Sequence, residues 1–287
     1  MESLKAIQQK QKVVFILGAT GTGKSKLSID LATRVPAEIV NSDKIQVLKG
    51  LDILTNKVTE EEKRGIPHHL LGVLDPEADL TVSDFCVLAC CAIEAILEKD
   101  RLPIIVGGSN RYVEALVDDE KVGFRSKYEC CFIWLDVATQ VHHSYVAKRV
   151  DEMVSSGLID EVRDVFKPDA DYTKGIRQSI GVPEMDKYLR LESEVNEETR
   201  KELLKEAIDE IKDNTCKLIH RQLEKIHRLQ NRPGWNIRRI DATEVFLKGG
   251  KEALVLWEKI VLEPSTKIVE HFLYGNTGCD DAPARYY

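Results

Sequence analysis

Short apolar runs, many of them β-branched, alternate with longer amphipathic segments through about the first two thirds of the chain. The runs predict strands at 13–17, 38–41, 69–73, 103–106 and 131–137. The segments between them predict helices near 24–34, 83–99 and 141–156, and Thr81 or Ser83 can cap the second of these. This alternation is typical of a parallel sheet covered by helices.

The pattern changes near residue 158 to long, charged, amphipathic helices. The clearest predicted helix covers 197–229, where apolar residues recur at intervals of three to five, as on a core-facing stripe. A late strand is predicted at 236–240. We therefore expect an α/β core over 1–140, a helical region over 141–230, a strand and C-terminal helix that return to the core over 231–274, and a disordered tail over 275–287.

Residues 18–25 read GATGTGKS and match the phosphate-binding pattern G-x-x-x-x-G-K-[ST]. They lie between a predicted strand and a predicted helix, which is the context that this motif requires. Glycines let backbone N–H groups surround a phosphate, and the helix N-terminus adds its positive end. Lys24 supplies a point charge and Ser25 offers a hydroxyl to Mg²⁺. The expected diphosphate- or nucleotide-binding residues of the loop are Gly18, Thr20, Gly21, Thr22, Gly23, Lys24 and Ser25. The fold class predicted is α/β, a P-loop NTPase-like parallel sheet flanked by helices, with a helical subdomain.

Reactive residues follow three of the predicted strands. In an open α/β sheet, ligands lie beyond the carboxyl ends of the strands. Asp43 follows the second strand and is placed to act as a base or a metal carboxylate. Asp136 resembles the acidic residue that ends a strand in many P-loop proteins, but a role in capping or turning the chain is the better interpretation. The loop predicts a bound diphosphate or triphosphate and does not by itself decide the reaction.

Composition narrows the classes of partner. The chain has 287 residues, a formal net charge of −7 and a pI of about 5.6. Proteins that grip long nucleic acids usually carry a basic surplus, so the charge balance predicts no nucleic-acid partner. No apolar run approaches the roughly 20 residues of a membrane helix. The seven cysteines include no C-x-x-C pair, which predicts neither a disulfide framework nor a zinc site and favours a reducing compartment.

Taken together, the motifs resemble the isopentenyltransferase family. The segments that carry the resemblance are GATGTGKS (18–25), NSDKIQV (41–47), GLDI (50–53), PHHL (67–70), VSDF (82–85), PIIVGG (103–108), VDEM (150–153), GLIDEV (157–162), IRQSIG (176–181), NT (214–215) and RQ (221–222). They occur in one order across about 13–230. The family transfers a dimethylallyl group from dimethylallyl diphosphate to N6 of adenine, so the resemblance implies this reaction, with diphosphate as the leaving group.

Within the family, the chain is most similar to the plant adenylate branch, which begins cytokinin synthesis on ADP, ATP or AMP. The residues after Gln222 are LEKI, whereas tRNA-modifying members usually carry an aromatic residue and an arginine there. Leu48 stands where those members usually carry Tyr. The resemblance implies a plastid location, although we expect no transit peptide in this chain; a cytoplasmic location is the alternative. The sequence leaves the oligomeric state open.

The resemblance also implies roles for single residues. Lys24, a Ser25-bound Mg²⁺, Ser109 and Arg177 would surround the diphosphate, and Arg177 suits this task because a guanidinium binds phosphate oxygens in pairs. Asp43 would accept a hydrogen bond from N6 and remove its proton. The expected catalytic residues are therefore Asp43, Lys24 and Arg177.

A basic face on the long helix has two interpretations. Lys217, Arg221, Lys225 and Arg228 either form a solvated surface or hold the acceptor's phosphates, and we expect Lys217 and Arg221 to bind nucleotide. Two other functions stay open, a tRNA dimethylallyltransferase and a small-molecule P-loop kinase. A non-catalytic nucleotide-binding module is disfavoured because it would leave Asp43 and Arg177 without a task.

Overall fold

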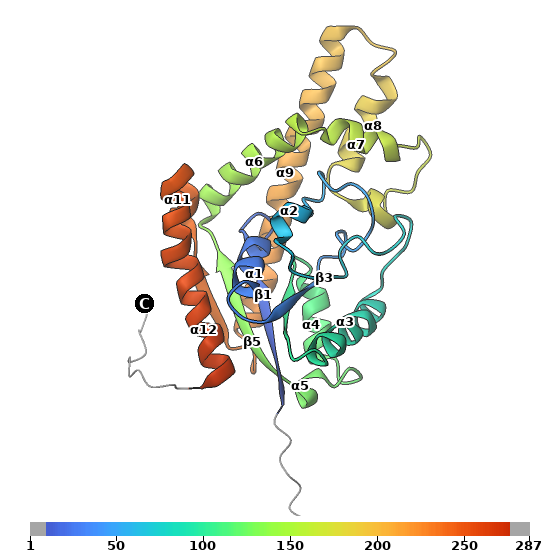
Figure 1. The fold of residues 1–287 in the computed structure, drawn as a ribbon. Helices are drawn as coiled ribbons and strands as arrows, with labels where there is room; N and C mark the ends of the chain where they lie inside the picture. The colour runs from blue at the N-terminus through green and yellow to red at the C-terminus, as the bar shows by residue number, and fades with distance from the viewer. Residues whose placement is uncertain (1–9, 276–287) are drawn as a thin grey trace, which may run out of the picture.

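The computed structural model describes residues 10–275, and Figure 1 shows its fold. Six parallel strands form one sheet in the order β3-β2-β4-β1-β5-β6. Their bounds are β1 Gln11–Leu17, β2 Ala37–Asn41, β3 His68–His69, β4 Leu102–Val106, β5 Tyr128–Asp136 and β6 Ile237–Asp241. The predicted parallel sheet is confirmed.

Alternating side chains of β1 divide the core into two layers. Val13, Phe15 and Leu17 pack on one face against α3 (Val82–Leu97), α4 (Asn110–Asp118), α5 (Phe124–Lys127) and part of α9 (Glu197–Gln230). Val14 and Ile16 pack on the other face against α1 (Lys24–Ala32) and the C-terminal helices. The sheet is therefore buried on both faces, as a parallel sheet requires.

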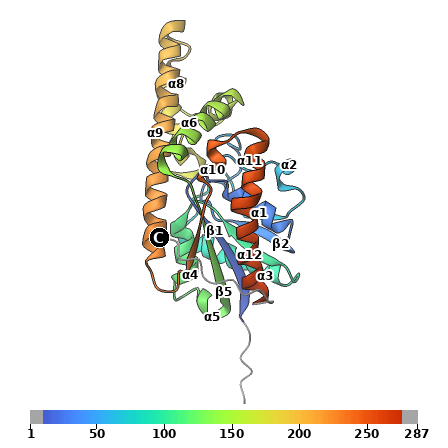
Figure 2. The same ribbon diagram turned by 90° about the vertical axis from the view of Figure 1, so that its left-hand side faces the viewer.

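The helices between β5 and β6 extend beyond the carboxyl ends of the strands, and α9 continues down one side of the sheet (Figure 2). They are α6 (Thr139–Ser155), α7 (Leu158–Val165), a 3₁₀ turn (Gly175–Gln178), α8 (Val182–Leu191) and α9. After β6 come α10 (Thr243–Leu247), α11 (Gly250–Leu256), a π-helical turn (Trp257–Leu262) and α12 (Glu263–Tyr274). The short helix α2 (Glu60–Lys63) precedes β3.

Three local predictions have clear outcomes. Thr81 caps α3, its side chain accepting from the Asp84 amide. The strand expected over 69–73 is wrong beyond His69, because Leu70 and Gly72 adopt positive φ angles of 58° and 62° and turn the chain out of the sheet. The tail expected to be disordered lies, Gly275 apart, outside the described residues.

The chain that follows β4 lies very close to the chain that follows β2. Gly107 follows β4, and a Cβ atom there would lie 2.6 Å from the Asp43 amide nitrogen and against the Ser42 carbonyl carbon. Two of the three nearest atoms belong to the backbone and the third is the hydroxyl oxygen of the buried Ser42, so they have little room to shift. Only glycine lets the two strand ends approach this closely.

We predict that Gly107→Ala destabilises the fold by about 1–3 kcal/mol, the usual cost of forcing a methyl group into a packed interior. Gly249→Ala is the control, because a Cβ at Gly249 meets nothing within 4 Å and its φ is −128°. Chemical denaturation of both variants measures the difference. Equal free energies of unfolding would contradict the close contact at Gly107.

Candidate active site

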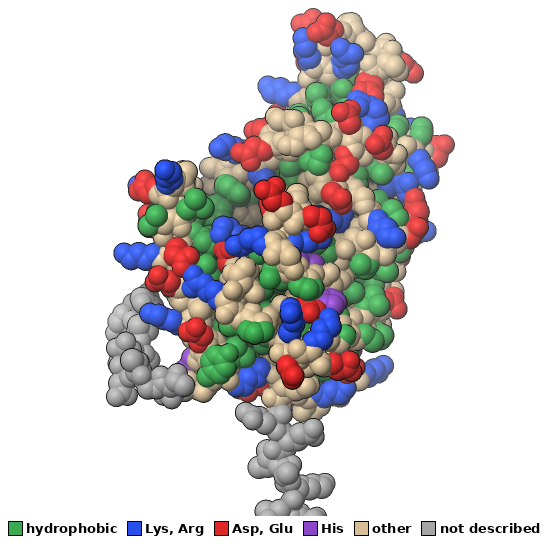
Figure 3. Space-filling view, viewed as in Figure 1, with side chains coloured by type: hydrophobic (Ala, Val, Ile, Leu, Met, Phe, Trp, Pro, Cys, Tyr) green, Lys and Arg blue, Asp and Glu red, His purple; other side chains and the backbone are tan. Residues whose placement is uncertain are grey.

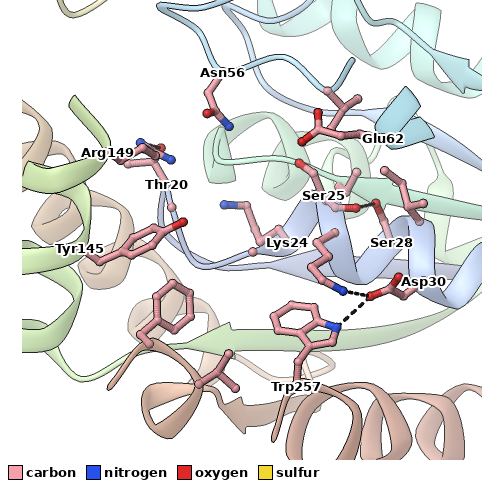
Figure 4. Close-up of a pocket in the computed structure, with 18 of the residues that line it drawn as sticks. Thr20, Lys24, Ser25, Ser28, Asp30, Asn56, Glu62, Tyr145, Arg149 and Trp257 are labelled. Carbon is pink, nitrogen blue, oxygen red and sulfur yellow. Dashed lines mark hydrogen bonds and ion pairs between the residues drawn. The ribbon is translucent and has the colours of Figure 1, made fainter. Parts of the chain in front are cut away.

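Two adjoining cavities open at the carboxyl ends of the strands. The first has a volume of about 1250 Å³ and contains most of the predicted P-loop residues, Thr20, Gly21, Gly23, Lys24 and Ser25 (Figure 4). The second, about 710 Å³, lies between the β2 and β4 ends and helices α6 and α9. Both are lined by Thr20, Asp43, Gly108 and Arg149, together with Thr55 and Asn56. The shared residues mark the junction of the two cavities.

The phosphate-binding loop has the backbone expected from its glycines. Gly18, Gly21 and Gly23 have φ angles of 154°, 82° and 87°, and α1 begins at Lys24. A Cβ at Gly18 would lie 2.5 Å from the Leu135 carbonyl oxygen. Thr22 is fully buried and its hydroxyl donates to the Ala19 carbonyl, 3.0 Å away. Gly18 and Thr22 therefore shape the loop and do not line either cavity.

Lys24 is a buried cation at the centre of the first cavity. Its Nζ donates to the Ala19 carbonyl oxygen at 2.6 Å. Burial lowers the pKa of Lys24 from 10.5 to about 8, against an opposing effect of the nearby Asp43 carboxylate and with a further lowering by Arg149. Burial removes the hydration that stabilises the ammonium, and a phosphate group in the cavity would stabilise the charge instead. Lys24 is thus suited to bind an anion.

Ser25 is the predicted metal ligand, and it lines the same cavity. No hydrogen bond of its hydroxyl is found among residues 10–275, and that region holds no cluster of three or more His, Cys, Asp or Glu side chains able to bind a metal. Mg²⁺ keeps several waters and is usually bound by one or two protein groups plus substrate phosphates. The residues present fit a metal that is held mainly by a diphosphate and by Ser25.

Asp43 lies at the junction, with one carboxylate oxygen fixed. Its Oδ1 accepts from the amides of Ile45 at 3.0 Å and Gln46 at 3.4 Å. Its Oδ2 is beside Gly108, where a Cβ would lie 3.2 Å from it. The backbone therefore orients the carboxylate and leaves Oδ2 toward the cavities, as a base for a bound substrate requires.

Arg149, on α6, was not predicted from the sequence. Its Nη2 donates to the Thr20 hydroxyl at 3.2 Å, while its buried Nε has no partner within the described part of the chain. Burial lowers the pKa of Arg149. In Figure 4 the guanidinium lies beside Thr20 at the edge of the P-loop cavity. A fork of N–H groups at this position suits the oxygens of a diphosphate. Its sequence context, a charged amphipathic helix, looks like a solvated surface and contains no signal for this role.

Arg177 does not reach the phosphate-binding loop. It is buried, and its Nη1 donates to both carboxylate oxygens of Glu77 at 2.5 and 2.6 Å, while Nε donates to the Val165 carbonyl at 3.2 Å. Neither cavity has Arg177 in its lining. The carboxylate of Glu77 holds the guanidinium in this position, outside the lining of both cavities.

The other predicted residues are divided between cavity and surface. The Ser109 hydroxyl accepts from the Lys44 amide at 2.9 Å, and Ser109 lines the second cavity but not the first. On α9, Arg221 and Lys225 line the second cavity. Lys217 is exposed and donates to Asn214 at 3.1 Å, and Arg228 pairs with Glu114. The basic face is therefore only partly a cavity wall.

Asp136 and the two histidines of β3 have structural partners, although His68 also lines the first cavity. Asp136 pairs with Arg239 at 2.7 Å. His69 contacts Glu38 at 2.7 Å, whereas His68 contacts the Ile66 carbonyl at 2.8 Å. The two histidines thus have different partners, as adjacent residues on a strand should.

Within residues 10–275 no helix is both long enough and apolar enough to cross a bilayer. Acidic and basic side chains are mixed over the face shown in Figure 3. That face therefore presents no extended surface of one charge.

Comparison with known proteins identifies relatives over nearly the whole chain. Adenylate isopentenyltransferase 5, chloroplastic, of Arabidopsis thaliana is 57% identical over 95% of this chain and 83% of its own length. Adenylate isopentenyltransferase 3, chloroplastic, of the same plant is 55% identical over 95% and 82%. A solved structure of a eukaryotic dimethylallyltransferase acting on tRNA has a TM-score of 0.75 and 23% identity, and covers 92% of this chain and 80% of the other, which supports the fold.

The family described as IPP transferase matches residues 46–124 and 118–228. These segments contain the strand end that carries Gly108, the helix that carries Arg149 and the half of α9 that lines the second cavity. Together with the identity to the Arabidopsis enzymes, this match shows that the chain belongs to the IPP transferase family.

Proposed function

We propose that this chain transfers a dimethylallyl group from dimethylallyl diphosphate to N6 of the adenine of ADP or ATP, with AMP as a further acceptor, and releases diphosphate. This is the first step of cytokinin synthesis. The observation that carries the proposal is the position of Asp43 at the junction of a P-loop cavity and a second cavity with basic walls. The names of the Arabidopsis relatives support the acceptor class.

The first cavity would hold the donor. Its diphosphate would bind the loop amides, Lys24 and Arg149, so that these groups stabilise the charge that develops on the leaving group. Ser25 would hold Mg²⁺, which would neutralise part of the same charge. The C1–O bond of the donor breaks as the new C–N bond forms, and the loop keeps the departing diphosphate in place.

The second cavity would hold the acceptor. The amino group of adenine is a weak nucleophile because its lone pair is delocalised into the ring, so removal of its proton assists the attack. Oδ2 of Asp43 would accept that proton. Lys44, Arg111, Arg221 and Lys225 line this cavity and would bind the acceptor's phosphates. A β- or γ-phosphate would give these cations more oxygens to bind.

The alternatives differ in acceptor or in chemistry. The matched tRNA enzyme shares the fold at 23% identity, so tRNA is the acceptor to test against nucleotides. A small-molecule kinase would form ADP from ATP, and neither matched relative is named as a kinase. The relatives' names also lead us to propose a plastid location.

The first prediction from the proposed function concerns the acceptor. ADP and ATP should be prenylated in preference to AMP, and unmodified tRNA should not react, because a few cavity cations match a short polyphosphate better than a long backbone. Competition at equal concentrations, with products identified by mass, measures the preference. Efficient modification of tRNA would contradict the acceptor and leave the chemistry standing, whereas ADP production without prenylation would favour the kinase.

The second prediction concerns the proposed base. Asp43→Asn should retain donor binding and slow the transfer by about 10²–10⁴-fold, the usual contribution of a general base. Single-turnover kinetics and donor titration separate the two effects. Asp213→Asn, an exposed carboxylate on α9, is the matched control and should behave like the parent. Loss of donor affinity with unchanged chemistry would make Asp43 a binding residue.

The third prediction concerns Lys24. Its ammonium must be charged to hold the diphosphate, and its pKa is about 8, so the donor Kd should stay flat below that pH and rise above it. The rise should approach about tenfold per pH unit, and binding near this pH should take up a proton. Calorimetry in buffers of different ionisation enthalpy measures both.

Lys24→Met removes the titrating group. It should bind the donor more weakly at every pH and show no inflection near 8. A flat donor Kd for the parent enzyme across the alkaline range would show that Lys24 does not provide the charge.

A further inference from the structure

Thr20 of the phosphate-binding loop is held at each of its polar groups by a different side chain. Its N–H donates to Gln222 Oε1 at 2.8 Å, and its carbonyl accepts from His142 Nε2 at 2.8 Å. Its hydroxyl accepts from Arg149 Nη2 at 3.2 Å. His142 and Arg149 belong to α6 and Gln222 to α9. Thr20 therefore links the phosphate-binding loop to both α6 and α9 by hydrogen bonds.

The nitrogen of the Gln222 side-chain amide contacts Gly108, which follows β4 and lies beside Asp43. Nε2 donates to the Gly108 carbonyl at 3.0 Å, and the main-chain carbonyl of Gln222 accepts from Asn110 Nδ2 at 3.2 Å. A Cβ on Gly108 would lie 2.5 Å from Gln222 Nε2 and 3.2 Å from Asp43 Oδ2. With an exposure of 7%, the Gln222 side chain fills the space between the loop and the β4 end.

His142 holds the main-chain carbonyl of the same residue, Thr20. It is fully buried, and burial lowers its pKa to about 4, so the ring is neutral at physiological pH. A neutral ring that bonds a carbonyl must carry its proton on that nitrogen, so Nε2 is the donor. The main-chain N–H and the main-chain carbonyl of Thr20 are thus both bonded by uncharged side chains.

We infer that Gln222 is a positioning residue, whose amide sets the separation between the Thr20 end of the diphosphate loop and Asp43. This inference rests on the proposed prenyl transfer. The Thr20 N–H is taken by Gln222, so the donor's diphosphate is left to Lys24, Arg149 and the remaining amides. Loss of the amide bridge should therefore disturb alignment more than donor affinity. A misplacement of about 1 Å between reacting groups can cost 10²-fold in rate.

The first test is Gln222→Met, which keeps the length of the side chain and removes both hydrogen bonds. Its kcat should fall by about 10²-fold, while the donor Kd changes by less than about threefold. Gln230→Met, the same change at an exposed position near the end of α9, is the control and should match the parent. A kcat like that of the parent, or a loss of donor affinity at unchanged kcat, would overturn the inference.

A double-mutant cycle with Gly108→Ala tests the bridge itself. The new methyl group should displace Gln222, so Gly108→Ala should lower kcat strongly in the parent and much less in Gln222→Met. Multiplicative effects would overturn the inference. If Gln222→Met does not fold, Gln222→Glu replaces it in the cycle, since the carboxylate keeps an acceptor for Thr20 and loses the donor to Gly108.

Hydrogen exchange of the Thr20 amide separates this inference from the proposed function. Exchange should be faster in Gln222→Met than in Gln230→Met whether or not either protein prenylates a nucleotide. If exchange is faster in Gln222→Met but the parent has no transferase activity, the proposed function is refuted and the Gln222 bridge is supported. Unchanged exchange with full transferase activity in the parent would refute the bridge alone.

Discussion

The contact between the ends of β2 and β4 at Gly107 determines the geometry of the site. The sheet order places β4 between β2 and β1, so Asp43, Gly108 and the phosphate-binding loop follow one another along one edge. A side chain at Gly107 would separate the first two and move Asp43 away from the loop. The absence of a side chain at Gly107 thus lets Asp43 lie close to the β4 end.

Electrostatics explains why the site favours an anion. Lys24 is buried, Arg149 is half-buried with a buried Nε, and neither forms an ion pair among the described residues. A buried cation without a partner is costly, and the pKa of each is lowered accordingly. In the proposed function a diphosphate would supply the missing counter-charges, so donor binding would offset this cost. The same cations would then stabilise the diphosphate as it departs.

The helices beyond the sheet complete a site that the sheet begins. α6 contributes Arg149 and His142, and α9 contributes Gln222 together with the basic wall of the second cavity. The two cavities therefore meet at Thr20, which is hydrogen-bonded to both helices. The side-chain amide of Gln222 links α9 to the phosphate-binding loop, so a shift of α9 would move this loop.

The sequence alone determined the parallel α/β fold, the phosphate-binding loop and the position of Asp43 after a strand. These features depend on hydrophobic period, glycine spacing and strand ends, all of which are local along the chain. The same local patterns wrongly extended the strand at His69, where two residues with positive φ end it. They also left the basic face of α9 with two interpretations.

Only the tertiary structure decided which long-range partners meet. Arg149 and Gln222 both contact Thr20 of the phosphate-binding loop, which lies 129 and 202 residues earlier in the chain. Arg177 pairs with Glu77, 100 residues away. The tertiary structure also directed Arg221 to a cavity and Lys217 to the surface of the same helix. A charged residue on an amphipathic helix has the same sequence pattern in either place, because its surroundings are set by packing between elements that are distant along the chain.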